Sequence, residues 1–341
     1  MNKVEITIIV PMYGGEAFLT ETLNSIKAQS FTNYEVLCID DCSPDRCKDI
    51  VEEFAKNDGR FKYFRTPQNL GIVPKVLNFA STYVSGNYFV YSSQDDLFSP
   101  DWLDKMWSAI TSKKADAAIP QLEFYFPNRE GNRRLSGIHG DITHEISGEE
   151  AFFLSLDWTI PGNALWKSSL LKKYGYFDFG MNADEYTVRY YFLRCSKVVF
   201  CDGVFYYRQN NPGAITKRVS PKSLDEPYNH FKVWQLINDE TNSPYYRINY
   251  STRVLASLIE KEILVLRNKS LKIHTPRLYG CIDGIRTRDF LSDLNISLKK
   301  HGKLSRPALM LAARSNLFRK IVCRFVILKR NLNSISFRSR G

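Results

Sequence analysis

The first 120 residues alternate apolar runs with amphipathic segments, and this alternation constrains the fold more than any other feature. Strands are predicted at 6–10, 34–40, 61–65 and 88–92. Helices are predicted between them, including one over 75–83 and one that Ser99 caps ahead of Pro100. Strand–helix alternation with short connections is typical of an α/β fold with a Rossmann-like, mostly parallel sheet flanked by helices.

The remaining chain changes character twice. Residues 121–220 are mixed: a capping box over 147–150, helices over 166–174 and 183–195, and short strands at 198–201 and 204–207. Beyond 221 only helices are predicted, near 226–238, 250–271 and 305–329. We therefore predict one domain over 1–220, in two halves of 1–120 and 121–220, followed by a helical C-terminal region over 221–341.

Acidic residues follow two of the predicted strands. Asp40 and Asp41 come after the second strand, and Asp95 and Asp96 after the fourth. In an open parallel sheet, ligands bind at the carboxyl ends of the strands. Two carboxylate pairs at one edge of the sheet repel each other unless a cation lies near them. A divalent metal ion bound to a diphosphate would supply that cation.

Charge and cysteine content narrow the class of protein. The net charge of +11 comes from the end of the chain, because residues 294–341 hold twelve Lys or Arg and no Asp or Glu. The preceding residues are nearly neutral, which argues against a nucleic-acid-binding body. The seven cysteines match no zinc spacing, and neither a signal peptide nor a membrane-spanning run of about 18 apolar residues is found. We expect a cytoplasmic protein with reduced thiols.

Five blocks in order resemble the inverting glycosyltransferases of family 2, which have the A-type glycosyltransferase fold. The blocks are Thr7–Tyr13, Leu23–Phe31, Tyr34–Ser43, Asn69–Gly71 and Gln94–Asp96. The likeness weakens toward residue 216. It implies a nucleotide-sugar-binding half over 1–120 and an acceptor-binding half over 121–220. The residues that it implies for the nucleotide sugar are Pro11, Tyr13, Asp41, Asn69, Lys75, Gln94 and Asp95.

The resemblance gives several of these residues a chemical role. Asp41 would accept the imide N–H of a uracil-type base, and Lys75 would reach a phosphate as a point charge. Asp95 and Asp96 would hold Mg²⁺ or Mn²⁺, since carboxylate oxygens suit both ions. The first acid of the family's Asp-x-Asp-Asp motif is Ser93 in this chain.

An inverting transfer also needs a base for the proton of the acceptor hydroxyl. Family members place it in a Glu-Asp pair at a helix start, some 90 residues past the metal motif. Here the pair is reversed, as Asp184 then Glu185. Strict register favours Glu185, and a shift of one residue selects Asp184.

Three further residues are expected near the acceptor and the diphosphate. Trp166 and Gly162 fall in a segment resembling the one that lines the family's acceptor pocket, where Trp166 is either a stacking surface for a sugar or a core residue. Arg208 is either a bidentate donor to the diphosphate or the partner of an acid.

The C-terminal segment 305–330 reads as a basic amphipathic helix, which favours contact with an anionic membrane surface or packing on the body. The predicted function is a metal-dependent inverting glycosyltransferase. It would move a sugar from a nucleoside diphosphate donor, UDP for preference, to a glycan or lipid-linked acceptor of a cell-surface polysaccharide. It would act in the cytoplasm or at the inner face of the membrane, without nucleic acid. The alternatives are a nucleotidyltransferase and an inactive, transferase-like binding module.

Overall fold

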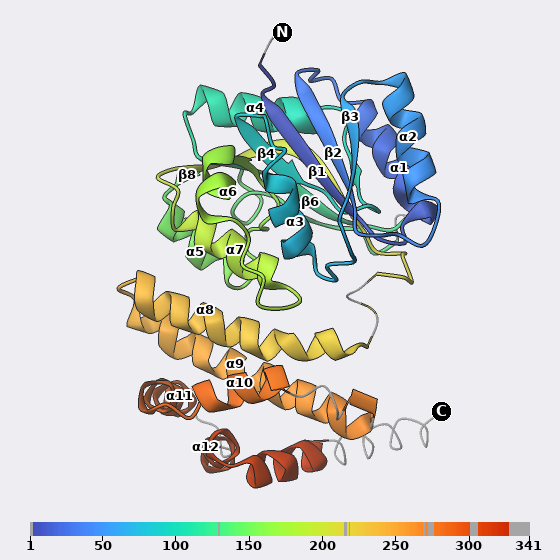
Figure 1. The fold of residues 1–341 in the computed structure, drawn as a ribbon. Coiled ribbons are helices and arrows are strands. Elements are labelled where there is room, and N and C mark those ends of the chain that lie inside the picture. The colour runs from blue at the N-terminus through green and yellow to red at the C-terminus, as the bar shows by residue number, and fades with distance from the viewer. Residues whose placement is uncertain are drawn as a thin grey trace. The chain divides into compact units, whose positions relative to one another are not determined.

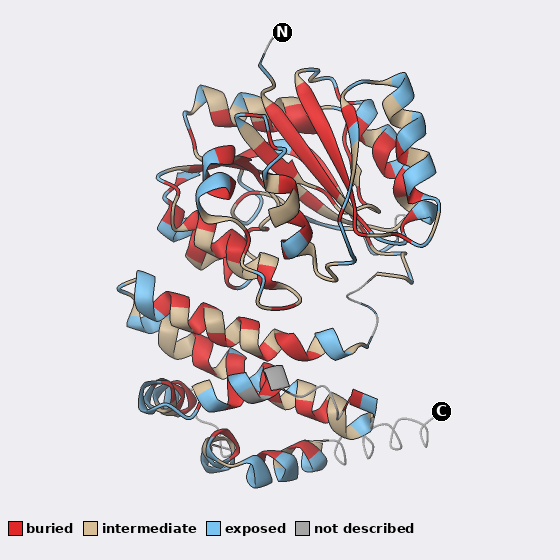
Figure 2. Cartoon of the chain, in the orientation of Figure 1, coloured by how far each residue is buried: buried red, intermediate tan, exposed pale blue. Residues whose placement is uncertain are grey.

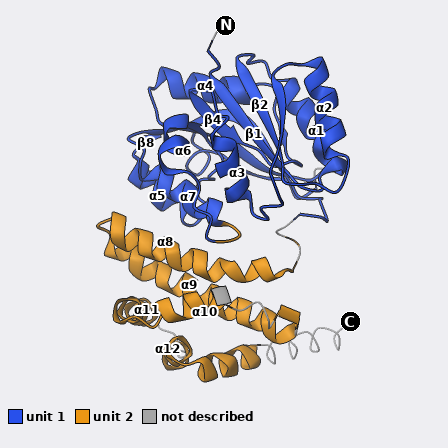
Figure 3. Ribbon diagram, in the orientation of Figure 1, with its two compact units in different colours: residues 1–179, 183–214 blue, residues 180–182, 215–341 orange. Residues whose placement is uncertain are grey.

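The computed structural model describes residues 3–128, 130–214, 217, 219–268, 270–271, 276–300 and 306–326. The chain forms two compact units (Figure 3). The first comprises residues 1–179 and 183–214, and the second 180–182 and 215–341.

The first unit is an α/β domain (Figure 1). Its strands are β1 (Ile6–Met12), β2 (Tyr34–Asp40), β3 (Phe61–Arg65), β4 (Tyr88–Tyr91), β5 (Leu97–Phe98), β6 (Ala117–Tyr125), β7 (Arg133–Leu135), β8 (Glu145–Ile146), β9 (Leu165–Lys167) and β10 (Val198–Arg208). Its helices are α1 (Glu16–Lys27), α2 (Cys47–Asn57), α3 (Val73–Ser81), α4 (Trp102–Ser112), α5 (Gly148–Ser155), α6 (Ser168–Tyr174) and α7 (Ala183–Phe192).

All ten strands belong to one mixed sheet with the path β3-β2-β1-β4-β9-β6-β10-β5. The four strands predicted from the first 120 residues are parallel neighbours, with β1 between β2 and β4. Short β9 runs antiparallel to both β4 and β6, and so joins the parallel half to the rest of the sheet. Because β1, β2 and β4 are parallel, their carboxyl ends lie at one edge, where the predicted acidic clusters fall.

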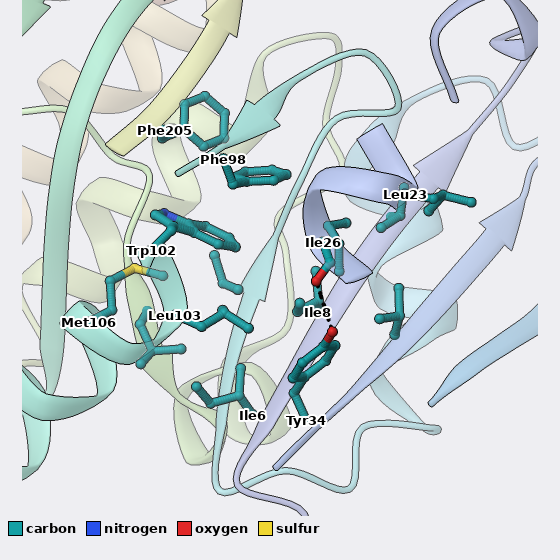
Figure 4. Packing of buried hydrophobic residues seen from close by; sticks show 14 of the residues in the cluster. Ile6, Ile8, Leu23, Ile26, Tyr34, Phe98, Trp102, Leu103, Met106 and Phe205 are labelled. Carbon is teal, nitrogen blue, oxygen red and sulfur yellow. Dashed lines mark hydrogen bonds between the residues drawn. The ribbon is translucent and has the colours of Figure 1, made fainter. Parts of the chain in front are cut away.

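Apolar side chains hold helices against this sheet. Every residue of β2 is buried, and Figure 2 shows β1 and β2 coloured as buried over most of their length. In the core seen in Figure 4, Trp102 of α4 stacks on Phe98 with ring centroids 4.1 Å apart. The Tyr34 hydroxyl donates to the Ile26 carbonyl at 2.8 Å, which ties the start of β2 to α1.

The second unit is helical. Its elements are the 3₁₀ helix η2 (Pro221–Asp225) and the α-helices α8 (Glu226–Glu240), α9 (Pro244–Arg267), α10 (Pro276–Gly284), α11 (Arg288–Lys300) and α12 (Arg306–Arg314), with residues 316–326 also helical. None of the helices in the described ranges is long and apolar enough to cross a membrane.

The expected fold class is confirmed, with local differences. The predicted helix over 166–174 begins only at Ser168, because Leu165–Lys167 forms β9. The two strands predicted at 198–201 and 204–207 are one strand, β10, with an irregularity between Phe200 and Val204. Ser315 interrupts the helix predicted over 305–329, and residues 305 and 327–329 lie outside the described part.

Candidate active site

The predicted donor residues gather at the carboxyl ends of β1, β2 and β4. The Asp41 N–H donates to the Met12 carbonyl at 2.8 Å, so the hydrogen bonding between β1 and β2 continues to the carboxyl end of both strands. The Ser92 N–H donates to the Ile9 carbonyl at 2.9 Å, which holds the loop after β4 beside β1. The three loops that carry the acidic residues and Tyr13 therefore leave a common sheet edge.

Asp40 stabilises the turn after β2. Its carboxylate accepts from the Ser43 N–H at 2.7 Å, the Tyr63 hydroxyl at 2.7 Å and Arg65 at 2.8 Å. The turn needs this support because Cys42 has a φ of 62°, a left-handed conformation that is uncommon for a residue with a Cβ. Asp40 is fully buried and has a structural role.

Asp41 organises the loop after β3. Its Oδ1 accepts from Thr66 Oγ1 at 2.9 Å and from the Leu70 N–H at 2.7 Å, and its Oδ2 from the Gly71 N–H at 3.0 Å. Gly71 can present that N–H because it adopts a φ of 78°, which favours glycine. A carboxylate has about four acceptor positions, so one position on Oδ2 is left for a further donor.

Asn69 and Lys75 differ in their freedom to contact a ligand. The Asn69 amide donates to the Asp41 carbonyl at 2.9 Å, so it fixes the loop. Lys75 lies exposed near the start of α3, and the described residues give its ammonium group no hydrogen bond or ion pair. Of the two, Lys75 has the free cationic group.

Gln94 clamps the loop after β1 to the loop after β4. Its amide oxygen accepts the Tyr13 N–H at 2.8 Å, and its amide nitrogen donates to the Tyr13 carbonyl at 3.1 Å. This leaves the Tyr13 ring 54% exposed just past the end of β1, while Pro11 is half-buried within that strand. Gln94 thus acts through Tyr13, whose ring is free to pack against a planar ligand.

Asp95 and Asp96 have different surroundings. Asp95 is half-buried, and its two oxygens accept from Ser93 Oγ at 2.7 Å and from Asn211 Nδ2 at 2.6 Å. Asp96 is buried and accepts the Arg208 N–H at 3.0 Å. Burial, followed by the charge of Asp95, raises the pKa of Asp96 well above its usual value. Asp95 is therefore the member of the pair suited to a cation.

Arg208, at the end of β10, holds the loop that carries Asp95 and Asp96. Its Nε donates to the Asp95 carbonyl at 2.6 Å and its Nη2 to Glu21 Oε2 of α1 at 2.6 Å. The side chain is buried, and both of these donors are engaged by the protein. Of the two roles predicted, pairing with an acid is the one observed.

Asp184 and Glu185 point to different partners from the first turn of α7. Asp184 Oδ2 accepts from the Tyr91 hydroxyl at 3.1 Å, which brings it to the end of β4. Glu185 is 41% exposed and pairs with Arg189 at 2.5 Å. Burial, and next the charge of Glu185, raise the pKa of Asp184 to about 6.

Of the two roles predicted for Trp166, the core residue is the one observed. Its indole is 1% exposed in β9 and packs on Tyr191 and Phe192, with centroids 5.6 and 4.9 Å away, so it cannot stack on a sugar. Gly162 lies against α7, where an added Cβ would meet Val188 Cγ1 at 2.5 Å. Gly162 therefore permits close packing beside the helix that carries Asp184.

Some supporting residues were not predicted as site residues. Tyr91 and Arg189 hold the two carboxylates of α7, Asn211 holds Asp95, and Glu21 holds Arg208. Only Arg189 has a signal in the sequence, since it follows Glu185 by four residues on a predicted helix. Glu21 also lines a cavity of 610 Å³, together with Tyr125 and Tyr206; no predicted site residue is among its described lining residues.

A sheet of this topology with acidic loops at the ends of β2 and β4 defines the A-type glycosyltransferase fold. Residues 7–175 match the family model described as glycosyl transferase family 2. Residues 7–175 therefore form a domain of that family.

Individual relatives agree with this assignment. Glycosyltransferase GlyA of Streptococcus pneumoniae is 26% identical over 227 residues, which are 62% of this chain and 32% of GlyA. TarS of Staphylococcus aureus, named a poly(ribitol-phosphate) beta-N-acetylglucosaminyltransferase, is 25% identical over 282 residues, which are 79% of this chain and 46% of TarS. The chain thus spans less than half the length of either relative.

Two solved structures share the fold. TarS 1-349 in complex with UDP-GlcNAc superimposes with a TM-score of 0.68 and 18% identity, covering 93% of this chain and 90% of that one. The mannosyltransferase PcManGT of Pyrobaculum calidifontis, in complex with GDP-Man and Mn²⁺, gives a TM-score of 0.53 and 16% identity, covering 92% and 86%.

Proposed function

We propose that this protein is an inverting glycosyltransferase that moves a sugar from a UDP-sugar to a hydroxyl group of a glycan or glycolipid. One observation carries the proposal. The Tyr91–Asp184 hydrogen bond brings a carboxylate whose pKa is about 6 to the end of β4, the strand that leads into the Asp95 loop. A proton acceptor and a cation ligand thus belong to one sheet edge.

The donor would lie across the ends of β1 and β2. The exposed Tyr13 ring would pack on the base, and the open acceptor position of Asp41 Oδ2 would take its imide N–H. Lys75, which has no charged partner among the described residues, would contact the diphosphate. Asn69 and Gln94 would support these groups through the backbone rather than touch the donor.

The site fits a Mg²⁺ or Mn²⁺ ion that is held largely by the donor. No group of three or more His, Cys, Asp or Glu side chains that could bind a metal occurs within the described ranges. Asp95 would be the protein ligand, with diphosphate and water oxygens completing the shell, as is usual for Mg²⁺ in nucleotide sites. Asp96, which accepts the Arg208 N–H, would keep the loop in place. When bound, the ion supplies Lewis-acid stabilisation of the leaving diphosphate.

Asp184 is the base in this mechanism, and Glu185 is not. A base works best when its pKa lies near the operating pH, which holds for Asp184. The acceptor oxygen forms a bond to C1 of the donor sugar while the bond from C1 to the diphosphate oxygen breaks on the opposite face. The hydroxyl proton passes to Asp184. Glu185 forms an ion pair with Arg189, and its negative charge raises the pKa of Asp184.

We propose a cell-surface polysaccharide as the setting and an anionic membrane as the docking surface. The TarS relative is named for transfer to a phosphate polymer, which supports the first point. For the second, Leu317, Ile321 and Phe325 are exposed on the helical stretch 316–326, and Phe325 is 67% exposed. Lys320 and Arg324 are exposed on the same stretch, so apolar and cationic groups are combined as at a membrane-binding helix.

Part of the segment predicted to bind the membrane is instead structural. Arg319 is fully buried, and its Nε donates to Glu262 of α9 at 2.7 Å. The residues from 327 onward lie outside the described part. The proposed docking face is therefore the exposed side of 316–326.

Calorimetric titration with UDP-GlcNAc, with and without Mn²⁺, tests the donor and metal assignments. We expect metal-dependent binding that Asp95→Asn weakens only when Mn²⁺ is present. Tighter binding of UTP than of UDP would favour a nucleotidyltransferase. Donor binding without any sugar transfer or hydrolysis would favour an inactive binding module.

Vesicle flotation tests the docking face. The double variant Lys320→Gln/Arg324→Gln should lose most binding to vesicles containing phosphatidylglycerol, and neutral vesicles should not bind the wild-type protein. Equal binding of wild type and variant would remove this assignment and leave the catalytic one untouched.

A further inference from the structure

The helical unit contains a groove of 1090 Å³ whose lining is strongly basic. Four of its lining residues are arginines and none is acidic; the nine described lining residues are Arg286, Arg288, Leu291, Ser292, Asn295, Arg306, Pro307, Met310 and Arg314. They come from the turn after α10, from α11 and from α12, three consecutive parts of the chain within residues 286–314. Nothing in the proposed transfer mechanism uses this groove.

Neutral side chains orient two of the arginines without cancelling their charge. Arg306 donates from Nε and Nη2 to the Asn295 amide oxygen at 3.1 and 2.6 Å. Arg286 donates from Nη2 to the Asn316 amide oxygen at 2.9 Å. The acid near Arg286 is Asp283, at 3.8 Å and 79% exposed, which is a weak surface pair.

Arg288 and Arg314 carry the remaining charge. Both are exposed, and neither has an ion pair among the described residues. Four guanidinium groups therefore line one groove, and the ion pair that the described residues give them is the weak one between Arg286 and Asp283. Like charges gathered in this way repel one another, and a bound anion would relieve that repulsion.

We propose that this groove binds a chain that carries two or more phosphate groups. Arginine suits this task because its planar fork donates two parallel hydrogen bonds to phosphate oxygens. Single phosphates would not span the groove, whose volume is at the upper end of small-molecule pockets. The apolar side chains of Leu291, Pro307 and Met310 would contact the carbon skeleton between the phosphates.

The assignment as an acceptor site rests on the proposed function, whereas phosphate binding itself does not. A transferase with a phosphate-bearing acceptor would use the groove to hold that acceptor by groups other than the reacting hydroxyl. Binding energy at a remote part of a substrate can then be used to orient the reacting part. The substrate class that follows is a phosphodiester or polyphosphate chain.

Calorimetry on the full chain with inorganic triphosphate tests the site, in EDTA so that metal-dependent donor binding does not contribute. Arg288→Gln/Arg314→Gln should weaken triphosphate binding at least tenfold. The matched control Lys320→Gln/Arg324→Gln removes the same charge elsewhere in this unit and should bind as the wild type does. Arg314→Gln alone serves as a milder variant, with thermal melts to confirm folding.

Three results would overturn the proposal. Equal losses in the two double variants would mean a nonspecific response to net charge. A comparable loss in Lys75→Gln would place triphosphate in the donor site. Binding of phosphatidylglycerol vesicles that Arg288→Gln/Arg314→Gln abolishes, without any triphosphate binding, would mean a lipid headgroup site. Failure of UDP-GlcNAc binding would affect only the proposed function.

Discussion

If Asp184 is the base, the acid limb of the pH–rate profile must follow its ionisation. Raising the pKa of an aspartate from 3.8 to about 6 makes its ionisation costlier by about 3 kcal/mol. At pH 5 about a tenth of the molecules would carry the carboxylate form, so the rate should be about a tenth of its plateau. Above pH 7 the rate should be nearly constant.

Two neighbours shift this limb in opposite directions. Glu185→Gln removes a negative charge that raises the pKa of Asp184, so the limb should move to lower pH and activity should persist. Tyr91→Phe removes a hydrogen bond that lowers the same pKa, so the limb should move to higher pH. Asp184→Asn should reduce the plateau rate by about 10² or more.

The assay is UDP release from UDP-GlcNAc between pH 4.5 and 9, measured at saturating donor. Hydrolysis is an adequate readout because water needs the same proton acceptor. Shifts of both variants in one direction would contradict the assignment. So would a dead Glu185→Gln beside an active Asp184→Asn, which would move the base by one residue.

Three further changes test the Asp95 loop, the packing beside α7 and the start of β2. Asn211→Ala removes a hydrogen bond of 2.6 Å from Asp95 and should weaken Mn²⁺-dependent UDP binding several-fold, as measured by calorimetry, while metal-free binding stays the same. Gly162→Ala should lower the unfolding free energy by about 1–3 kcal/mol in urea melts, and Val188→Ala in the same chain should recover part of the loss. Glu35→Gln should be less stable at pH 7. Burial raises the pKa of Glu35, but its hydrogen bonds outweigh burial, and the pKa is lowered from 4.5 overall. The ionised carboxylate therefore stabilises the fold above about pH 4.5, and this stabilisation is lost as the pH falls. In acid the melting curves of the variant and the wild type should converge.

The half of the domain that is predicted to bind the donor could be predicted from the sequence, because its local patterns of apolar and turn residues match the strands and helices that form in the structure. The strands at 34–40 and 61–65 have the predicted bounds, since each is a short apolar run between clear turn signals. Ser147 caps α5 by accepting the Glu150 N–H, as the capping box predicts. The acidic pairs come at the ends of the strands at 34–40 and 88–92, so their common edge could also be predicted.

The sequence left roles open, or gave the wrong local structure, where contacts between residues distant in sequence decide the outcome. Trp166 lies in a segment with helical spacing, but pairing of β9 with β4 and β6 makes that segment a strand. Arg208 has a guanidinium that suits phosphate, yet Glu21 lies 187 positions earlier in the chain and engages it. The helices α10 and α11 had no expectation at all, because short amphipathic runs among loops give a weak periodic signal.

The opposite partners of Asp184 and Glu185 have a consequence for how such enzymes diverge. Successive residues on an α-helix point about 100° apart, so only one of two adjacent acids can face a given cleft. The rotation of the helix about its axis, fixed here by Tyr91 on one side and Arg189 on the other, would then select which of the two acids can act as the proposed base. Exchanging the sequence order of the two acids therefore need not change the reaction, provided that the residues that bind them change as well, so that an acid still faces the same cleft. Lineages could exchange Glu-Asp for Asp-Glu without passing through an inactive ancestor.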